Sequence, residues 1–131
     1  MYLSKIIILF ILTICIVSSH EIYTKTQLRG LYQHHMNKLL NEEIQYIVER
    51  VVVFAQINYT SYTHIYSVDS KIIFSESSKI LLKFSDEKIL TRLQSILIDA
   101  NIKISEPKCC NLVCDTTNIN NPLCKHIVID W

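Results

Sequence analysis

Apolar residues recur three and four positions apart over much of the first half of the chain, which is the period of an α-helix. Asn41 interrupts this pattern, and two glutamates follow it, as is typical of a helix start. We therefore predict two helices, or one broken helix, over residues 25–37 and 40–56. The β-branched run Val51–Val53 leaves a strand as the competing prediction at that point.

A strand, a third helical segment and two further strands are predicted downstream. Apolar and polar residues alternate over 62–68, which indicates a half-buried strand. Ser85 can cap a helix with an apolar stripe that ends at Asn101. Aliphatic residues at 102–104 and 126–131 predict two more strands.

This order of elements predicts an α+β fold in two layers. The helices are expected to pack on one face of a small, mostly antiparallel sheet, with a disulfide-tied loop near the C-terminus. The length of 131 residues suits one domain, and no repeat or linker divides the chain. We predict a single α+β domain over residues 20–131.

The first 19 residues have the build of a secretory signal peptide. Lys5 precedes an apolar run over residues 6–17, and small residues lead to a cleavage site at Ser19–His20. As a helix, residues 6–19 would span roughly 21 Å at ~1.5 Å per residue. A bilayer core of ~30 Å needs a longer segment. We therefore predict cleavage and export through the secretory pathway, with a retained membrane anchor as the alternative.

Four cysteines near the C-terminus predict two disulfides in an exported chain. Cys15 would leave with the signal peptide, and adjacent cysteines make a strained ring. The remaining pairings are Cys109–Cys114 with Cys110–Cys124, or Cys109–Cys124 with Cys110–Cys114. Either would tie down the polar segment between them.

Zinc is the alternative use of these cysteines. Cys110-x3-Cys114 has a spacing suited to metal ligands, and Cys124 with His126 could complete a four-coordinate site. The single residue between the last two ligands makes this half of the site tight. We therefore predict disulfides, no metal and no cofactor.

Composition excludes several classes of function. Thirteen basic and twelve acidic residues leave a net charge of +1, so no strong field recruits nucleic acid. The single glycine, Gly30, cannot build a phosphate-binding loop, and no nucleophile elbow or dinucleotide fingerprint is present. We predict a protein that is not an enzyme.

Isolated titratable residues carry only weak indications of chemistry. The pair His34–His35 points in two directions from a helix, so we expect one half-buried and one exposed imidazole. His64 is expected to be a packing or surface residue. Glu42, Glu43 and Glu49 are expected on a solvated helix face. A non-standard catalytic site would have to combine His64, His126, Asp115 and Asp130.

Two features indicate contact with other molecules. Asn58 opens an N-glycosylation sequon that an exported chain could carry glycosylated. Tyr62 and Tyr66 lie on one face of the predicted strand and form either core or a protein contact patch. The segment Cys109–Cys124 is the other expected contact surface, and membrane contact is expected only if residues 1–19 are retained.

Three parts of the chain form a recognisable set, which are the helix-to-strand segment 44–62, the helix and strand over 89–104, and the closing aliphatic-Asp-Trp strand 127–131. Together they resemble small, largely uncharacterised α+β proteins of large nucleocytoplasmic DNA viruses. The resemblance covers residues 42–131 and implies a viral origin, but no activity. It agrees with 22 Ile and only 2 Ala, a balance typical of A/T-rich genomes. The signal-like start and the clustered cysteines depart from that group.

These observations predict an exported or virion-associated structural or binding protein that disulfides stabilise. The first alternative is a single-pass, membrane-anchored viral or host-interaction protein. The second alternative is a small enzyme with a non-standard site.

Overall fold

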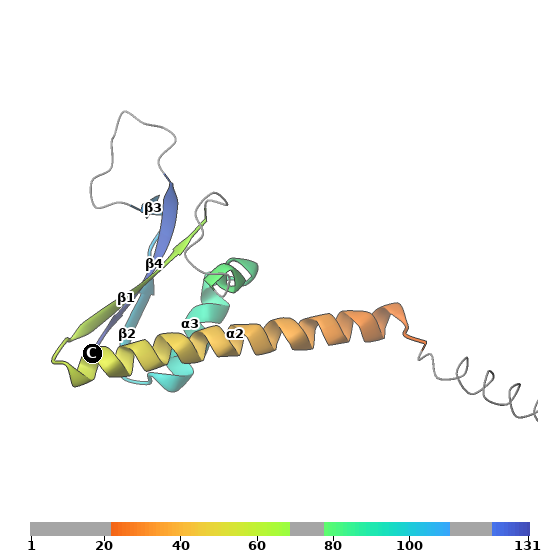
Figure 1. Ribbon diagram of the computed structural model, residues 1–131, viewed down its shortest axis with the longest axis horizontal. Coiled ribbons are helices and arrows are strands. Elements are labelled where there is room, and N and C mark those ends of the chain that lie inside the picture. The colour runs from red at the N-terminus through yellow and green to blue at the C-terminus, as the bar shows by residue number, and fades with distance from the viewer. Residues whose placement is uncertain (1–21, 69–77, 111–121) are drawn as a thin grey trace, which may run out of the picture. The chain divides into compact units, whose positions relative to one another are not determined.

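The computed structural model describes residues 22–68, 78–110 and 122–131. The predicted signal peptide and Cys15 therefore lie outside the described residues. The boundary between two compact units falls inside the first helix, between His34 and His35. In chain order the elements are α2 (Lys25–Gln56), β1 (Ser61–Ser67), η1 (Ser78–Lys83), α3 (Asp86–Ile96), β2 (Asn101–Ile104), β3 (Lys108–Cys109) and β4 (Leu123–Asp130) (Figure 1).

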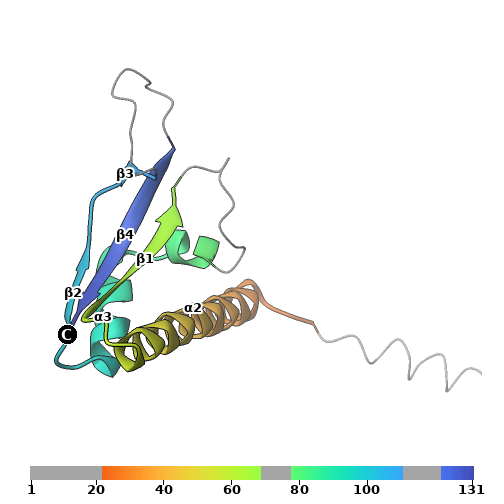
Figure 2. The same cartoon turned by 60° about the vertical axis from the view of Figure 1, so that its left-hand side comes forward.

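The sheet is antiparallel throughout, and β4 lies at its centre (Figure 2). Strand β1 pairs with one side of β4, while β2 and β3 pair with the other. Ile127 of β4 is opposite both His64 of β1 and Ile104 of β2. The predicted α+β class with a small antiparallel sheet is confirmed.

Helix α2 runs without interruption through Asn41, so the predicted break is wrong. The apolar stripe that packs on the sheet continues across this position from Leu40 to Ile44 and Val51. Burial of that stripe outweighs the modest helix propensity of one asparagine. The amide oxygen of Asn41 accepts a hydrogen bond from Arg92 of α3 instead of capping α2. The alternative strand at residues 51–53 is likewise wrong.

Helix α3 begins as predicted and ends earlier than predicted. The Ser85 hydroxyl accepts a hydrogen bond from the Lys88 backbone N–H at 3.3 Å, which caps the first turn. The helix ends at Ile96. The Gln94 amide donates to three backbone carbonyls just beyond this end. Asn101, the predicted helix end, instead begins β2.

The hydrophobic core lies between the inner face of the sheet and the helices. Both helices and η1 contribute to one cluster, and Figures 1 and 2 show α3 and η1 on the side of the sheet that faces α2. This arrangement confirms the two-layer prediction. The buried members are Leu40, Ile44, Ile47, Val48, Val51, Tyr66, Leu81, Ile89, Leu93, Ile127 and Ile129.

Candidate functional site

The helices in the described parts of the chain pack on one face of the sheet, and its outer face has no helix on it. Alternation along the strands directs Thr63 and Ile65 of β1 to this face, with His126 and Val128 of β4 beside them. Lys103 of β2 borders the same face opposite Val128. These side chains form an apolar centre with polar neighbours. We call these five residues the outer-face patch.

Of the two alternatives for the Tyr62 and Tyr66 face, core or protein contact patch, the structure places Tyr66 in the core. The Tyr66 side chain is only 1% exposed and packs in the core, and Tyr62 is half-buried. Strand β1 turns its aromatic residues toward the helices because that face buries more apolar area. The exposed face of β1 carries Thr63 and Ile65 instead.

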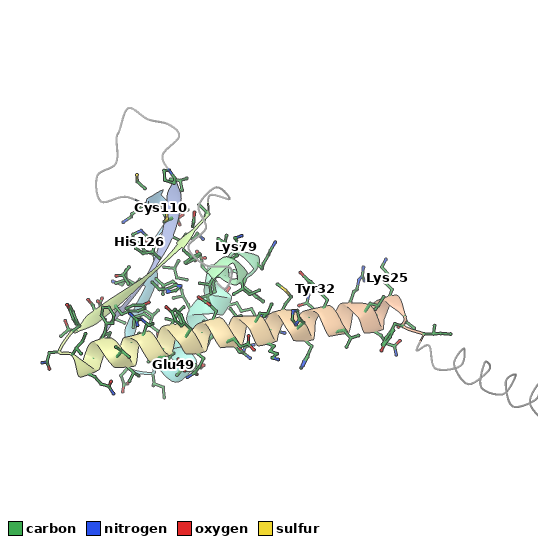
Figure 3. All side chains as sticks on the ribbon, viewed as in Figure 1. Lys25, Tyr32, Glu49, Lys79, Cys110 and His126 are labelled. Atoms are coloured by element: carbon green, nitrogen blue, oxygen red, sulfur yellow. A yellow bond between two sulfur atoms is a disulfide. The ribbon has the colours of Figure 1, made fainter. Side chains whose placement is uncertain are left out.

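A disulfide links Cys110 to Cys124 at the end of the sheet where β3 pairs with β4. Figure 3 places Cys110 near this end, with His126 further along the sheet. Of the two predicted pairings, this bond matches the one with Cys110–Cys124 and rules out the one with Cys109–Cys124. Cys109 is also disulfide-bonded. Its partner lies outside the described residues, so a Cys109–Cys114 bond stays a prediction.

The alternative zinc site is not formed in this structure. Cys110 and Cys124 share their sulfurs in a disulfide, so neither offers a thiolate to a metal. Cys114 lies outside the described residues. Among the residues that are described, no three His, Cys, Asp or Glu side chains are grouped so that they could hold a metal ion.

A buried polar cluster joins α2 to β1. Glu43 is 3% exposed and His64 is 6% exposed, and Glu43 Oε1 lies 3.5 Å from His64 Nε2. The other ring nitrogen of His64 lies 3.3 Å from the Tyr62 hydroxyl. The prediction that Glu43 is solvated is therefore wrong, whereas Glu42 and Glu49 are exposed as predicted. Glu43 is buried because it follows the same helical stripe as its apolar neighbours in the core.

Aromatic and cationic side chains surround the Tyr62 end of this cluster. The Phe54 ring packs edge-on against the Tyr62 ring, with 5.0 Å between the ring centroids. The Tyr46 ring packs against the His64 ring, with 6.3 Å between the centroids. Burial raises the pKa of Tyr62, with smaller contributions from Tyr46 and Glu43, while the hydrogen-bonded Arg50 opposes the shift. The phenol thus keeps its proton beside the imidazole. The row of groups therefore runs from the half-buried Tyr62 hydroxyl, past the His64 ring, to the buried Glu43 carboxylate.

The predicted catalytic combination does not come together. His64 lies on the inner face of the sheet, but His126 and Asp130 lie on the outer face. Asp115 lies outside the described residues. The two histidines of the pair His34–His35 are both exposed, so the expectation that one is half-buried is also wrong.

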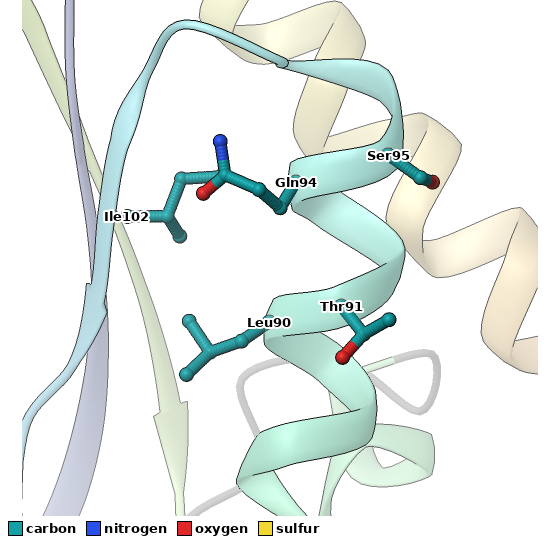
Figure 4. A pocket seen from close by; sticks show the side chains of 5 residues that line it. All are labelled: Leu90, Thr91, Gln94, Ser95 and Ile102. Carbon is teal, nitrogen blue, oxygen red and sulfur yellow. The ribbon is translucent and has the colours of Figure 1, made fainter.

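A hollow of about 520 Å³ lies between α3 and β2 (Figure 4). Leu90 and Gln94 extend from α3 toward Ile102 of β2, and Thr91 and Ser95 complete the lining. The sequence offered no signal for this hollow, because its two sides meet only when the helix folds back on the strand. It contains no charged side chain, so it offers shape and hydrogen bonds rather than a reactive group.

The glycosylation sequon lies in the turn between α2 and β1. Asn58 is exposed and has a φ of 69°, a left-handed conformation that asparagine adopts more readily than most residues. The exposed side chain is accessible, and glycosylation stays a prediction.

No family model, curated protein or solved structure matches the chain. The resemblance to proteins of large nucleocytoplasmic DNA viruses therefore stays a prediction. No helix in residues 22–68, 78–110 and 122–131 has the length and apolar character needed to cross a membrane.

Proposed function

We propose that this protein is an exported binding protein, stabilised by disulfides, that contacts another protein through the outer-face patch. The Cys110–Cys124 disulfide is the observation that carries the proposal. Disulfides persist in oxidising compartments and are rare in the cytosol. A chain that keeps this bond therefore fits the secretory pathway, the cell exterior or the surface of a virus particle.

The start of the sequence supports export independently of the disulfide. The apolar run over residues 6–17 and the small residues after it fit a cleavable signal. Loss of residues 1–19 would also remove Lys5 and leave a chain with no net charge. A viral origin, as the resemblance implies, would make the virion surface one destination.

The composition of the outer-face patch supports a protein partner. Ile65 is 37% exposed, and the half-buried Val128 lies beside it on the central strand. An apolar centre with a polar surround is the usual anatomy of a protein interface. The single cationic neighbour, Lys103, gives too little charge for a nucleic-acid surface. Non-enzymatic binding therefore remains our preferred function.

Export is tested by expressing the full chain in eukaryotic cells and comparing medium, soluble cell extract and carbonate-washed membranes. We expect the protein in the medium, with an N-terminus at or near His20 and an intact mass four hydrogens below that of the reduced chain. A matched variant, Ile11→Lys, interrupts the apolar run and should stay in the cells. Soluble intracellular protein that starts at Met1 would refute export, and protein in washed membranes would favour the retained anchor.

The contact surface is tested by placing a photo-reactive cross-linker at Val128 in cells that produce the protein. We expect one specific cross-linked partner protein, whose yield falls when Lys103 is changed to Glu beside the cross-linker. The same cross-linker at the exposed Glu49 of α2 is the control and should not capture that partner. Equal capture from both positions would argue against the outer-face patch.

A further inference from the structure

Strand β1 forms an edge of the sheet with backbone groups directed outward. The Val68 N–H donates to the Leu123 carbonyl, and the Trp131 N–H donates to the Thr60 carbonyl. The backbone N–H and C=O groups of the even-numbered residues in this strand therefore point toward β4. Those of the odd-numbered residues point away, because the direction of these groups alternates along an antiparallel strand. The backbone N–H and C=O groups of Thr63 and Ile65 point away from β4. No strand in the described parts of the chain pairs with them.

This edge lacks the features that normally keep edge strands from pairing. Its sequence, SYTHIYS, contains no charged residue and no proline. Proteins usually protect an exposed edge with charge, proline or a bulge. By contrast, the other edge strand, β2, has Lys103 in its middle and Pro107 shortly after its end.

The residue pattern of β1 is nearly symmetric about His64. Serines occupy both ends, tyrosines come next, and the β-branched Thr63 and Ile65 flank the centre. An antiparallel copy centred on His64 places Thr63 opposite the partner's Ile65. These are the positions whose backbone groups point outward, so the ladder of hydrogen bonds can form in this register. No charge meets a like charge, so this surface is electrostatically compatible with its own copy.

Exposed apolar side chains flank the edge on both faces of the sheet. Ile65 is 37% exposed on the outer face, and Tyr46 is 49% exposed on the helix side, against His64. Tyrosine and aliphatic residues are typical of the centres of protein interfaces. A second strand paired with this edge would therefore cover exposed apolar area on each face of the sheet.

We propose that β1 pairs antiparallel with β1 of a second copy of this chain, which joins two sheets into one across a two-fold axis. Such an interface is isologous, because each copy contributes the same residues. The proposal does not depend on the partner proposed for the outer-face patch, although the two surfaces share Thr63 and Ile65; the dimer uses the backbone groups of these residues.

The test compares the wild-type full-length protein, purified as cells produce it, with two edge variants by light scattering across a concentration series. Thr63→Pro removes an N–H that points away from β4, so the fold should tolerate it while strand pairing is lost. Ile65→Lys adds a charge opposite the partner strand. We expect a wild-type dimer and a dissociation constant at least about tenfold higher for each variant. Ile98→Lys, at an isoleucine that is 75% exposed after α3, is the matched control and should dimerise normally.

Hydrogen exchange distinguishes this dimer from any other. The Thr63 and Ile65 amides should become protected as the concentration rises, and the Ile65 amide should stay unprotected in Thr63→Pro. Circular dichroism and thermal unfolding establish that the variants remain folded. A wild-type monomer at every concentration, or a dimer that both edge variants retain, would overturn the proposal. Loss of the partner cross-link at Val128 with an intact dimer would refute only the proposed function.

Discussion

At the scale of single residues, the core contains buried polar groups that differ in how their burial affects the free energy of unfolding. Tyr66 has a buried hydroxyl with no hydrogen-bond partner among the described residues, close to the ion pair of Lys125 and Asp86. A buried polar group without a partner costs free energy. Glu43 and His64 differ from Tyr66, because Glu43 Oε1 lies 3.5 Å from His64 Nε2. The Tyr66 hydroxyl is therefore the group whose removal should cost least.

We expect Tyr66→Phe to be neutral or to stabilise the protein by up to about 1 kcal/mol at pH 7, because the ring keeps its packing. Burial, with a smaller contribution from Asp86, raises the pKa of Tyr66 in the folded chain. Above pH 10 the unfolded chain releases this proton first, so the free energy of unfolding falls as the pH rises. Urea unfolding from pH 7 to 11 should show a shallower alkaline loss in Tyr66→Phe than in wild type.

Tyr32→Phe is the matched control for this prediction. Tyr32 is 57% exposed on α2, so its removal should leave the alkaline loss unchanged. The pKa of Tyr62 is raised like that of Tyr66, so Tyr62 should account for part of the alkaline loss of stability that remains in Tyr66→Phe. If the free energy of unfolding falls equally with pH in wild type and Tyr66→Phe, Tyr66 is not a source of the alkaline loss of stability.

At the scale of elements, local capping explains α3 but not α2. The first turn of α3 is polar. The Ser85 hydroxyl accepts a hydrogen bond from a backbone N–H, and the carboxylates of Asp86 and Glu87 interact favourably with the positive end of the helix dipole. Helix α2 continues through a similar signal at Asn41, where Leu40 directly before this residue and Ile44 three positions after it are both buried. A cap therefore sets a helix start only where packing does not favour continuation.

We expect Ser85→Ala to lower the free energy of unfolding by about 1 kcal/mol, because the Lys88 N–H loses its acceptor. Ser95→Ala provides the control, since the Ser95 hydroxyl donates to the Arg92 carbonyl within the helix and is exposed. That change should lie within about 0.5 kcal/mol of zero. Chemical denaturation of the three proteins at one pH gives the comparison. If Ser85→Ala lowers the free energy of unfolding no more than Ser95→Ala does, the Ser85 cap does not contribute to stability.

At the scale of the whole molecule, the sheet is joined by one central strand and one described disulfide. Strand β4 pairs with every other strand, so its place in the sheet organises the fold. The Cys110–Cys124 bond ties the chain after β3 to β4 across a sequence separation of 14. The bond thus restricts the unfolded chain between two segments that must pair.

We expect the double variant Cys110→Ala with Cys124→Ala to lower the free energy of unfolding by about 3 kcal/mol, because a loop of this length is no longer closed. The pair Cys109→Ala with Cys114→Ala is the control. If those two cysteines are bonded, it should cost about 2 kcal/mol, since the closed loop is shorter. Equal stability of the Cys110–Cys124 variant and wild type under oxidising conditions would contradict the stabilising role of the disulfide.

Features that depend on neighbouring residues could be predicted from the sequence. The alternation of β1, the cap at Ser85 and the helical stripe of α2 follow from periods and hydrogen bonds within a few positions. The class of fold follows from their order, because amphipathic helices and strands must cover one another's apolar faces. The clustered cysteines likewise limited the disulfides to two pairings.

Features that depend on residues far apart in the chain became visible only in the folded protein, which the tertiary structure describes. It buried Glu43 beside His64, turned the tyrosines of β1 inward, and joined Cys110 to Cys124. It also placed β4 between β1 and β2, and so left the uncharged strand β1 at an edge. The local sequence pattern is compatible with each of these outcomes and with its alternative. Each depends on which distant surfaces meet, and on the free energy gained when their apolar areas leave water together.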